Sequence, residues 1–435
     1  MTPIQAQSLP LMLKGLDVIA QAKTGSGKTA AFGLTLLNRL HTDQYTTQAL
    51  VLCPTRELAE QVAQVLRRLA RLIPNVKILN LSGGIPMRPQ VDSLKHGAHV
   101  IVGTPGRVQK HVDGESLTLK HLQTLVLDEA DRMLDMGFED EIKRVISFCQ
   151  KKRQTLLFSA TFPDEIKELA NTFMRAPKHV SIKNTKIALD MNQYFYEVSN
   201  QAEKFSLLKA LLYHYQPVST LIFCNTKGQT TSLLAHLNKE GFSTVALHGD
   251  MEQASRDRAM IRFANQSCSI LVATDVAARG LDIKELPAVI NYDLAFDHDV
   301  HVHRIGRTGR AGCQGLALNL TTPGDAERLC VLEDSGMKLS WGNAQTLNRN
   351  TTFPKPEMVT LSMAIGRKDK IRPGDILGAL TQDAGLDAQH IGKIDVSSLY
   401  TYVAIKQHQL NKAYTFIKQG KIKGRTTRIS VMKGA

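Results

Sequence analysis

Short apolar runs alternate with longer helical patterns along most of the chain, and this alternation restricts the possible folds more than any other feature. From residue 15 onward the runs are "DVIAQA", "QALVLC", "VKILNL", "HVIVGT", "TLVLDE" and "QTLLFSA". Buried strands that alternate with helices predict a parallel sheet with helices on both faces. The rhythm restarts after residue 190 with "STLIFCN", "STVALHG", "SILVATD", "AVINYD" and "GLALNL". We therefore predict an α/β fold with two parallel-sheet domains in tandem.

The end of the chain has a different pattern. After the polar stretch "LSWGNAQTLNRNTTFPKPEM", strands are expected at 359–366, 391–396, 398–406 and 426–432, and helices at 373–384 and 408–419. This βαββαβ order is the layout of a small α+β domain that resembles an RNA-recognition motif. We predict domains at residues 1–185, 190–345 and 359–435, with a linker at 346–358. A second polar segment, "SIKNTKIALDMNQ", is expected to link the first two domains.

Charge and cysteine content restrict the partners and the compartment. The net charge is +14, and residues 364–435 hold 13 Lys and Arg against 5 Asp and Glu. This balance favours a polyanionic partner such as nucleic acid, although a basic surface can also serve solubility. The six cysteines form no CxxC pair, which favours reduced thiols in a cytoplasmic protein over a disulfide framework or a zinc site. No run approaches the apolar length of a membrane span, and no signal peptide opens the chain.

The stretch "QAKTGSGKTA" lies between an apolar run and a helical pattern, which is the context of a phosphate-binding loop. Gly25 and Gly27 allow backbone N–H groups to approach phosphate oxygens, and the helix N-terminus that follows favours anions. Lys28 is expected to reach the β- and γ-phosphates, and the Thr29 hydroxyl to ligate Mg²⁺. The alternative is a glycine-rich turn without function. The predicted nucleotide-binding residues of the loop are Ala22, Thr24, Gly25, Ser26, Gly27, Lys28 and Thr29, with Ala22 standing where the common pattern has its first glycine.

The stretch "TLVLDEADRM" places two carboxylates, Asp128 and Glu129, at the end of a hydrophobic strand. In a parallel sheet this is the edge at which the phosphate loop also lies. Asp128 is expected to hold Mg²⁺, and Glu129 to orient or deprotonate the attacking water. An acidic cluster that caps a helix is the alternative.

These motifs, together with several others along the chain, resemble those of a known protein family. The segments "AKTGSGKT" (22–29), "PTREL" (54–58), "TPGR" (104–107), "DEAD" (128–131) and "SAT" (159–161) resemble the DEAD-box RNA helicases. The second domain continues the match with "IFCNT" (222–226), "HGDMEQASR" (248–256), "ATDVAARGLD" (273–282) and "HRIGRTGR" (303–310). The resemblance covers about residues 1–340 and implies two RecA-like domains that bind ATP and RNA.

The resemblance also implies roles for residues around the nucleotide. Arg307 and Arg310 would act as arginine fingers from the facing domain, a contribution of about 10³–10⁵ in rate. His303 would join the interface between the domains, Asp282 would contact the ribose, and Gln5 would read adenine. Ser159 and Thr161 would couple RNA binding to Asp131 and the ATP site. Hydrolysis would then require both domains to close.

The resemblance further implies a set of RNA contacts. Short hydroxyls, glycine N–H groups and arginines suit contacts to phosphates that do not read sequence, and 2′-hydroxyls allow discrimination against DNA. The residues implied are Thr55, Arg56, Gly83, Gly84, Thr104 and Arg107 in the first domain and Thr226, Gly249, Arg256 and Thr274 in the second.

One part of the family pattern is missing. In the family an aromatic residue that stacks on adenine precedes the glutamine, but this chain opens at "MTPIQ". We interpret the chain as a truncated form of a longer protein, or Met1 as an internal methionine of one. In either case the stacking aromatic is absent, which would affect the affinity for ATP.

The C-terminal region resembles the RNA-binding domain of DbpA-type bacterial DEAD-box helicases, through "IRPGDILGALTQDAGLDAQHIGKIDV" and "GKIKGRTTRI". This implies recognition of a hairpin of 23S ribosomal RNA during assembly of the large subunit. Tyr400 and Tyr402, two positions apart on one strand, are candidates for base stacking, unless they pack under the sheet. A solvated charge run is the alternative for the basic residues. The predicted basic RNA contacts are Arg367, Lys368, Lys370, Arg372, Lys421, Lys423, Arg425 and Arg428.

The sequence thus predicts an ATP- and Mg²⁺-dependent RNA helicase that separates short duplexes and acts as a cytoplasmic monomer on pre-50S particles. Two alternatives stay open, namely an ATP-gated RNA clamp or assembly scaffold, and a DNA translocase with the same two-domain core. The sequence leaves open the RNA element, any unwinding polarity and the oligomeric state. Without nucleotide, the two helicase domains are expected to lie apart.

Overall fold

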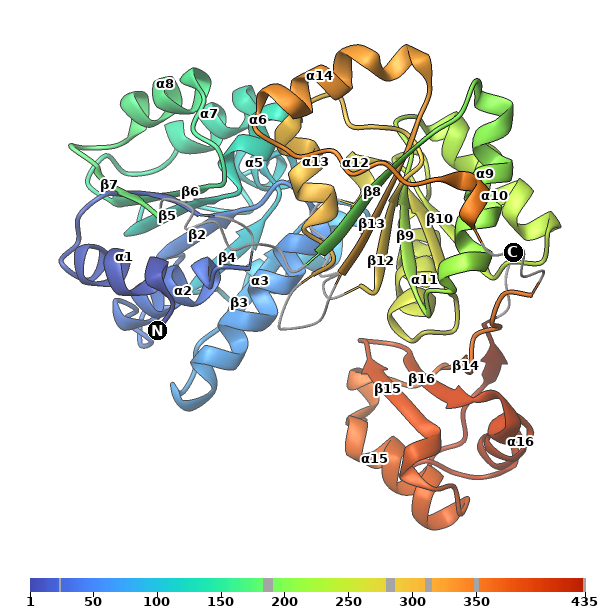
Figure 1. Cartoon of the computed structure of the whole chain (residues 1–435). Helices are drawn as coiled ribbons and strands as arrows, with labels where there is room; N and C mark the ends of the chain where they lie inside the picture. Colours follow the sequence, from blue (N-terminus) through green and yellow to red (C-terminus); the bar gives the residue numbers. More distant parts are fainter. Residues whose placement is uncertain (23–24, 183–190, 279–285, 310–314, 348–351, 433–435) are drawn as a thin grey trace. The chain divides into compact units, whose positions relative to one another are not determined.

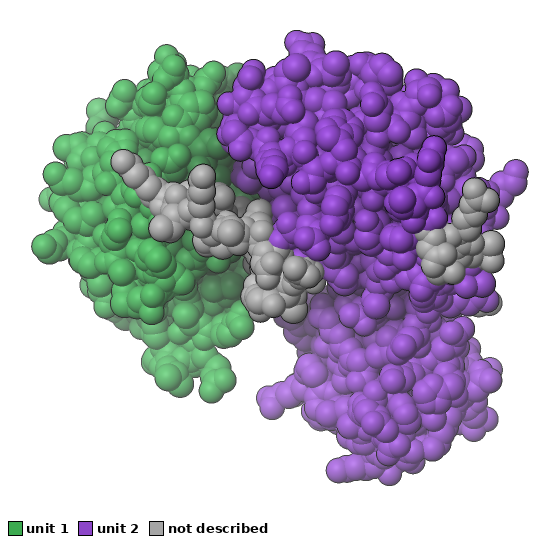
Figure 2. All heavy atoms as spheres, viewed as in Figure 1, with its two compact units in different colours: residues 1–185, 280–282 green, residues 186–279, 283–435 purple. Residues whose placement is uncertain are grey.

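The computed structural model describes residues 1–22, 25–182, 191–278, 286–309, 315–347 and 352–432. The chain divides into two compact units (Figure 2), the first built on residues 1–185 and the second on residues 186–279 and 283–435. The first unit contains one β-sheet and the second contains two.

The first unit is a parallel sheet of seven strands in the order β3-β4-β2-β5-β6-β1-β7 (Figure 1). Its strands are β1 (Val18–Gln21), β2 (Ala49–Leu52), β3 (Ile78–Leu81), β4 (Val100–Gly103), β5 (Thr124–Asp128), β6 (Gln154–Ser159) and β7 (Lys178–Ser181). Its helices are α1 (Pro3–Leu13), α2 (Lys28–Asn38), α3 (Arg56–Leu69), α4 (Met87–Leu94), α5 (Pro105–Asp113), α6 (Ala130–Asp135), α7 (Glu139–Ser147) and α8 (Asp164–Phe173).

Alternate residues of these strands pack into two separate cores, one on each face of the sheet. Val51 of β2 lies in the core with the α1–α3 layer, whereas Leu50 and Leu52 lie in the core with α5–α8. Because successive side chains of a strand point to opposite faces, a strand buried on both faces must be apolar throughout. This explains the continuous apolar runs in the sequence.

The register of the sheet brings three sequence motifs to one edge. Gln21 of β1 is paired with Ser159 of β6, and Asp128 of β5 with Phe158. The residues that follow these three strands belong to the phosphate loop, the "DEAD" segment and the "SAT" segment. The carboxyl ends of parallel strands are where ligands bind in open α/β sheets.

The second unit begins with a parallel sheet of six strands in the order β10-β11-β9-β12-β13-β8. Its strands are β8 (Met191–Glu197), β9 (Thr220–Phe223), β10 (Thr244–Leu247), β11 (Ile270–Ala273), β12 (Ala288–Asn291) and β13 (Gly315–Thr321). Its helices are α9 (Gln201–Tyr215), α10 (Lys227–Lys239), α11 (Gln253–Ala264), α12 (Asp275–Ala278), α13 (His298–Ile305) and α14 (Ala326–Asp334). The predicted polar segment therefore enters this sheet at Met191, where the edge strand β8 pairs with β13.

One buried histidine links α13 to this edge. His301 is fully buried, its Nε2 lies 2.9 Å from the side-chain amide of Gln193, and its ring stacks on Phe195 at 6.2 Å. Burial, assisted by the positive charge of Arg304, lowers the pKa of His301 from 6.5 to about 4. Phe195 also packs against Trp341, the single tryptophan of the chain.

We expect this domain to lose stability as the pH falls from 6.5 to 4. Between these values the unfolded chain binds a proton at residue 301 that the folded state rejects, so the free energy of unfolding falls by up to roughly 3 kcal/mol. Urea unfolding followed by Trp341 fluorescence measures it. His301→Gln should remove this part of the pH dependence. His298→Gln, at a partly exposed position of the same helix, should leave most of it in place, because the charge of His298 is the smallest of the three causes that lower the His301 pKa. Equal acid sensitivity in all three proteins would contradict the assignment.

The third sheet is antiparallel, with the order β15-β16-β14-β17. Its strands are β14 (Met358–Met363), β15 (Ile391–Val396), β16 (Thr401–Lys406) and β17 (Ile429–Val431), and its helices are α15 (Pro373–Gly378) and α16 (Leu410–Gln419). A π-helical turn, Ala379–Asp383, continues α15 over the rest of the predicted helix. The strands β14, β16 and β17 are shorter than predicted, because the pairing in register stops at Met363, Thr401 and Ile429, and Tyr400 therefore lies just outside β16. The predicted fold class, two RecA-like parallel-sheet domains followed by a βαββαβ domain, is confirmed.

The described residues between the second and third sheets contact the second sheet's domain. Leu347 is buried, the Phe353 ring packs on Phe242 at 5.1 Å, and the Gln216 side chain donates to the Thr352 carbonyl at 3.0 Å. These contacts hold the described part of this segment along the domain that precedes it.

Candidate nucleotide and RNA sites

The phosphate loop requires glycine at residue 27. Gly25 and Gly27 have φ values of +84° and +93°, a conformation that L side chains rarely adopt. A Cβ added at Gly27 would lie 2.5 Å from Nε2 of Gln5. Lys28 begins α2, is buried, and donates from Nζ to the Ala22 carbonyl at 2.9 Å. The predicted loop residue Thr24 lies outside the described residues.

Gln5 is bound directly to this loop. Its Nε2 donates to the Gly27 carbonyl at 3.1 Å, and its Oε1 accepts from the Thr2 backbone at 2.9 Å in a capping box that begins α1. Helix α1 thereby places the residue predicted to read adenine beside the residues predicted to hold the phosphates.

Asp128 lies at the carboxyl end of β5 with 3% of its surface exposed. Burial raises the pKa of Asp128 to about 7, against the opposing effect of Lys28. Within the described residues, its Oδ1 is a buried oxygen without a hydrogen-bond partner, and the hydroxyl of Ser26 is buried without one as well. Mg²⁺ is usually held by one or two carboxylates together with substrate phosphates, so these residues fit that ion.

Glu129 has an unusual backbone conformation and a buried charged partner. Its φ is +54°, in the left-handed region, and it precedes α6. Its Oε2 accepts a hydrogen bond from Nη1 of Arg132 at 2.8 Å, and both side chains are almost fully buried. Strained backbone is often found at functional sites. Arg132 lies directly after the "DEAD" letters and is a site residue that was not predicted from the sequence.

Asp131 and Thr161 are brought together as a hydrogen-bonded pair. Oδ2 of Asp131 accepts from the Thr161 hydroxyl at 3.0 Å, the Thr161 N–H at 2.9 Å and the Ala160 N–H at 3.1 Å. Burial opposes ionisation of Asp131, but the hydrogen bonds from Thr161 outweigh it and lower its pKa. Ser159 joins the phosphate loop through its backbone, because its carbonyl accepts from the Ala22 N–H at 3.0 Å. The "DEAD" and "SAT" segments thus form one connected network.

The predicted RNA contacts of the first unit gather at helix N-termini. Thr55 and Thr104 are the N-cap residues of α3 and α5, which follow β2 and β4, and both are buried. The guanidinium of Arg56 lies 3.1 Å from the position that a Cβ at Gly83 would take. Gly84 has a φ of +81°. Exposed N–H groups of helix N-termini and nearby arginines favour phosphate binding.

Gln90 is a residue that the sequence analysis missed. It is 5% exposed, and its Oε1 accepts from Nη1 of Arg107 at 2.9 Å and contacts Nε2 of His111 at 2.9 Å. Burial and the nearby charge of Arg56 lower the pKa of Arg107. Gln90 therefore orients one of the predicted RNA-binding arginines, and nothing in its sequence context marks it.

In the second unit, too, a predicted RNA-binding threonine lies at a helix N-terminus. Thr226 is the N-cap of α10 and accepts from the Gln229 N–H at 3.2 Å. The remaining predicted residues are Gly249, which follows β10; Arg256 on α11; Thr274, which is buried after β11; His303 on α13; and Arg307, which is 8% exposed just beyond α13. The predicted Asp282 and Arg310 lie outside the described residues.

Arg304, within the same motif, was also missed. It is 1% exposed and bonds both carboxylate oxygens of Asp275, at 2.7 and 2.6 Å, together with the Asn225 side chain at 2.7 Å. It also donates to the Asp293 carbonyl at 2.6 Å. A fully buried guanidinium with this many acceptors fixes α13, and the residues after it, to the sheet.

In the third domain, two basic loops that are far apart in sequence meet. Lys423 donates from Nζ to the Lys370 carbonyl at 2.9 Å and to Asp375 at 3.2 Å, and Arg425 pairs with Asp369 at 2.9 Å. The resulting groove, of about 710 Å³, is lined by Arg367, Lys370, Ile371, Arg372, Pro373, Ile394, Asp395, Val396 and Lys423. The other predicted basic contacts lie close in sequence to these loop residues and are exposed to solvent, namely Lys368, Lys421 and Arg428.

Tyr400 and Tyr402 lie on the face of this sheet that is turned away from its core. Tyr400 is 45% exposed, Tyr402 is half-buried, and their rings are 6.4 Å apart. The centre of the same face is covered. Thr360 is fully buried, with its hydroxyl 2.7 Å from that of Ser267 and 3.3 Å from the donating amide of Asn265. Tyr400 is thus the more accessible of the two candidates for base stacking.

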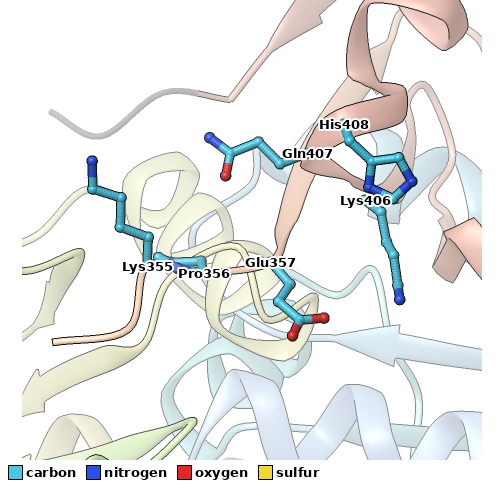
Figure 3. A pocket seen from close by; sticks show the side chains of 6 residues that line it. All are labelled: Lys355, Pro356, Glu357, Lys406, Gln407 and His408. Carbon is cyan, nitrogen blue, oxygen red and sulfur yellow. The ribbon is translucent and has the colours of Figure 1, made fainter.

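A shallow pocket of about 520 Å³ lies where β14 begins and β16 ends (Figure 3). It is lined by Lys355, Pro356, Glu357, Lys406, Gln407 and His408. The side chains of Lys355 and Lys406 point in different directions (Figure 3), so the pocket does not focus positive charge on one point. The Gln407 N–H donates to the Glu357 carbonyl at 2.8 Å and joins the two segments that line the pocket.

The described residues contain neither a metal site made of protein side chains alone nor a membrane-spanning helix. Across those ranges, no three side chains of His, Cys, Asp or Glu cluster so that they could bind a metal ion by themselves. Within the same part of the chain, no helix combines the length and apolarity needed to span a bilayer.

Family models match three consecutive parts of the chain. Residues 2–169 match the DEAD/DEAH box helicase model, residues 203–312 match the helicase conserved C-terminal domain, and residues 360–431 match the DbpA RNA binding domain. The last match covers the third sheet and its basic groove.

Individual helicases are similar to this chain in sequence and in structure. The ATP-dependent RNA helicase DbpA of Escherichia coli is 52% identical over 100% of this chain and 94% of its own length. The helicase CshA of Limosilactobacillus reuteri is 44% identical over 76% of this chain and 67% of its own. A structure of S. cerevisiae Dbp5 bound to RNA and ADP BeF3 has a TM-score of 0.70 and 32% identity, covering 79% of this chain and 90% of that one.

Proposed function

Because the chain belongs to the DEAD-box ATP-dependent RNA helicases of the DbpA type, we propose that its third domain directs the helicase to a hairpin of 23S ribosomal RNA. The protein is an RNA-dependent ATPase and helicase with a separate RNA-binding domain. The directed step belongs to assembly of the large ribosomal subunit, on pre-50S particles. The observation that carries this proposal is the meeting of two basic loops in one groove.

The groove suits structured RNA for a physical reason. Four cations, Arg367, Lys370, Arg372 and Lys423, surround a concave surface instead of lying dispersed on a convex one. A concave surface on which cations outnumber acids concentrates positive potential and favours a polyanion, and Asp395 is the one acidic residue among those that line this groove. Asp369 and Asp375 hold the second loop against the first, which fixes the spacing of the cations for a defined RNA shape.

ATP hydrolysis is assigned to the edge of the first sheet. Lys28 and the loop N–H groups would bind the phosphates, and Thr29 with Asp128 would hold Mg²⁺, which neutralises charge on the transferred phosphoryl group. Gln5 would recognise adenine, and Glu129 would orient the attacking water. Arg307, Arg310 and His303 would act from the second domain, and Asp282 would contact the ribose.

Coupling between RNA and ATP is assigned to the network of Asp131 and Thr161. Three donors from the "SAT" segment converge on Asp131, which lies in the same short segment as Asp128 and Glu129. RNA held by the threonines and arginines at the helix N-termini would favour the arrangement in which this network is intact and hydrolysis proceeds. One RNA strand is then held in a form incompatible with pairing.

The targeting proposal is tested by RNA-stimulated ATPase and duplex-unwinding rates with a 23S ribosomal RNA fragment, an unrelated structured RNA and matched DNA. Replacing Lys370 and Arg372 together by glutamine should raise the concentration of the 23S fragment needed for half-maximal activation at least about tenfold. The same change at Lys412 and Lys418, exposed lysines of α16, removes equal charge and should have little effect.

A chain ending near residue 350 supplies the second comparison. It should be activated equally by both RNAs, because the third domain is absent. If all of these proteins respond equally to every RNA, the targeting proposal is wrong and the groove is a solvated charge cluster. ATPase stimulation without duplex separation would instead favour the RNA clamp.

We also propose that the protein acts as a monomer in the cytoplasm. The scattered cysteines suit a reducing compartment, and the proposed ribosomal substrate is assembled there. Light scattering coupled to gel filtration should give a mass near 48.1 kDa, and a mass near twice that value would contradict the monomer.

A further inference from the structure

Glu129 and Arg132 form an ion pair that is buried from solvent. The Nη1–Oε2 distance is 2.8 Å, and the side chains are 6% exposed for Arg132 and 5% for Glu129. The pair spans one turn at the start of α6, and the next residue after each partner, Ala130 and Met133, is fully buried. Removing two charges from water is unfavourable unless each finds a well-placed partner.

Other ion pairs of the same unit differ in their exposure. Arg144 and Asp113 pair at 3.0 Å with side chains that are 53% and 38% exposed, and Lys143 and Glu139 pair in solvent on α7. Exposed pairs of this kind contribute little and hold neither side chain firmly. The Glu129–Arg132 pair is the one that involves the carboxylate assigned to the attacking water.

The local geometry limits the motion of Glu129. Its φ of +54° sets the direction in which the side chain leaves the backbone. The guanidinium of Arg132 then fixes one carboxylate oxygen, and the Arg132 N–H also donates to Oδ1 of Asp131 at 3.1 Å. Arg132 therefore touches two of the four "DEAD" residues, one through its side chain and one through its backbone.

We propose that Arg132 is a positioning residue for ATP hydrolysis, whose guanidinium holds the Glu129 carboxylate in the orientation that aligns the attacking water. This inference rests on the proposed role of Glu129. The planar guanidinium donates in a fixed direction, which the flexible ammonium of lysine does not reproduce. A carboxylate displaced by about 1 Å from its productive position can lower a rate by about 10²-fold.

A merely structural role for Arg132 makes a different prediction. Loss of the arginine would then lower stability and impair ATP binding, RNA binding and turnover together. A positioning role instead lowers kcat while the KM for ATP and the affinity for RNA change little. It also makes the effects of residues 129 and 132 non-additive, because Arg132 acts through Glu129.

The test uses the full chain with Arg132→Lys, Arg132→Gln, Glu129→Gln and the double variant Glu129→Gln/Arg132→Gln. Steady-state ATPase rates at saturating RNA give kcat and KM, a fluorescent ATP analogue gives binding, and urea unfolding checks the fold. Arg132→Gln should lower kcat by about 10–100-fold, and Arg132→Lys should restore little of it. Arg144→Gln, which breaks the exposed pair, should behave as the parent protein.

The double variant separates a positioning role from a loss of stability caused by an unpaired buried charge. It leaves no unpaired buried charge at this position, so it should fold at least as well as Arg132→Gln, and its kcat should equal that of Glu129→Gln alone. If Glu129→Gln is inactive but Arg132→Gln retains full kcat, or if the two losses multiply in the double variant, the positioning role is wrong. If Glu129→Gln itself retains hydrolysis, the assignment of Glu129 fails first.

Discussion

Replacement of Glu129 by glutamine is expected to lower kcat for RNA-stimulated ATP hydrolysis by about 10²–10⁴-fold, the usual contribution of a positioned acid–base group. The amide keeps the size of the side chain but loses the charge that attracts a proton from water. Lys28, Thr29 and Asp128 stay in place, so affinity for ATP should be nearly unchanged. Single-turnover hydrolysis with excess enzyme, compared with equilibrium binding of an ATP analogue, separates the two effects.

Glu129→Gln is also expected to change the release of RNA. A protein that binds ATP without hydrolysing it should hold RNA for longer, since release is proposed to follow hydrolysis. Dissociation of labelled RNA in the presence of ATP should therefore slow in Glu129→Gln. Unchanged turnover would show that another group activates the water, and normal RNA release without turnover would break the proposed link between hydrolysis and strand release.

Replacement of Arg307 by alanine should lower kcat by about 10³-fold or more, because an arginine finger stabilises charge on the transferred phosphoryl group. Arg307 lies two residues beyond the end of α13, and the buried contacts of Arg304 with Asp275 and Asn225 fix that helix to its sheet. The catalytic arginine would thus be supplied by a rigid element. Arg307→Lys should rescue little, because lysine lacks the planar fork that matches phosphate oxygens.

The control for Arg307 is Arg328, which pairs with Asp325 on the same domain at 2.8 Å. Arg328→Ala removes an equal charge and should retain most of the activity. Binding of ATP and of RNA to Arg307→Ala, measured separately, should stay near parent values if the domain is intact. Equal losses in the two alanine variants would point to the charge or stability of the domain instead of a finger.

The sequence was informative where local rules decide the structure. Strands buried on both faces must be apolar throughout, so β2, β5 and β6 were visible as runs of letters. The phosphate loop was visible because a left-handed backbone close to another side chain permits only glycine, as at Gly27. The pairing of Asp131 with Thr161 shows two segments implied by the family resemblance in direct contact.

Sequence reasoning missed residues whose role depends on distant neighbours. Gln90 is one amide among many in the chain, and only folding places it between Arg107 and His111. Arg304 lies in a motif with three arginines, and no spacing rule distinguishes the buried arginine from those assigned to ATP. The start of β8 reads as linker because Asn192 and Gln193 are polar. An edge strand tolerates Asn192 on its exposed side, and the Gln193 side chain on the other side bonds the buried His301.

The third domain shows most clearly which features can be read from the sequence and which depend on the folded structure. The residues themselves indicate that the end of the chain is basic and that its elements follow the order βαββαβ, whereas the predicted strand was too long, since Tyr402 lies in β16 and Tyr400 directly precedes it. The groove formed by the loops around residues 370 and 423 exists only in the folded chain, because the hydrogen bonds and ion pairs between the loops join residues some fifty positions apart. The tertiary structure alone decided that Tyr400 is open while Thr360, on the same face, is buried. Short-range order follows from neighbouring residues, whereas burial and charge clustering follow from contacts that exist only after the chain has folded.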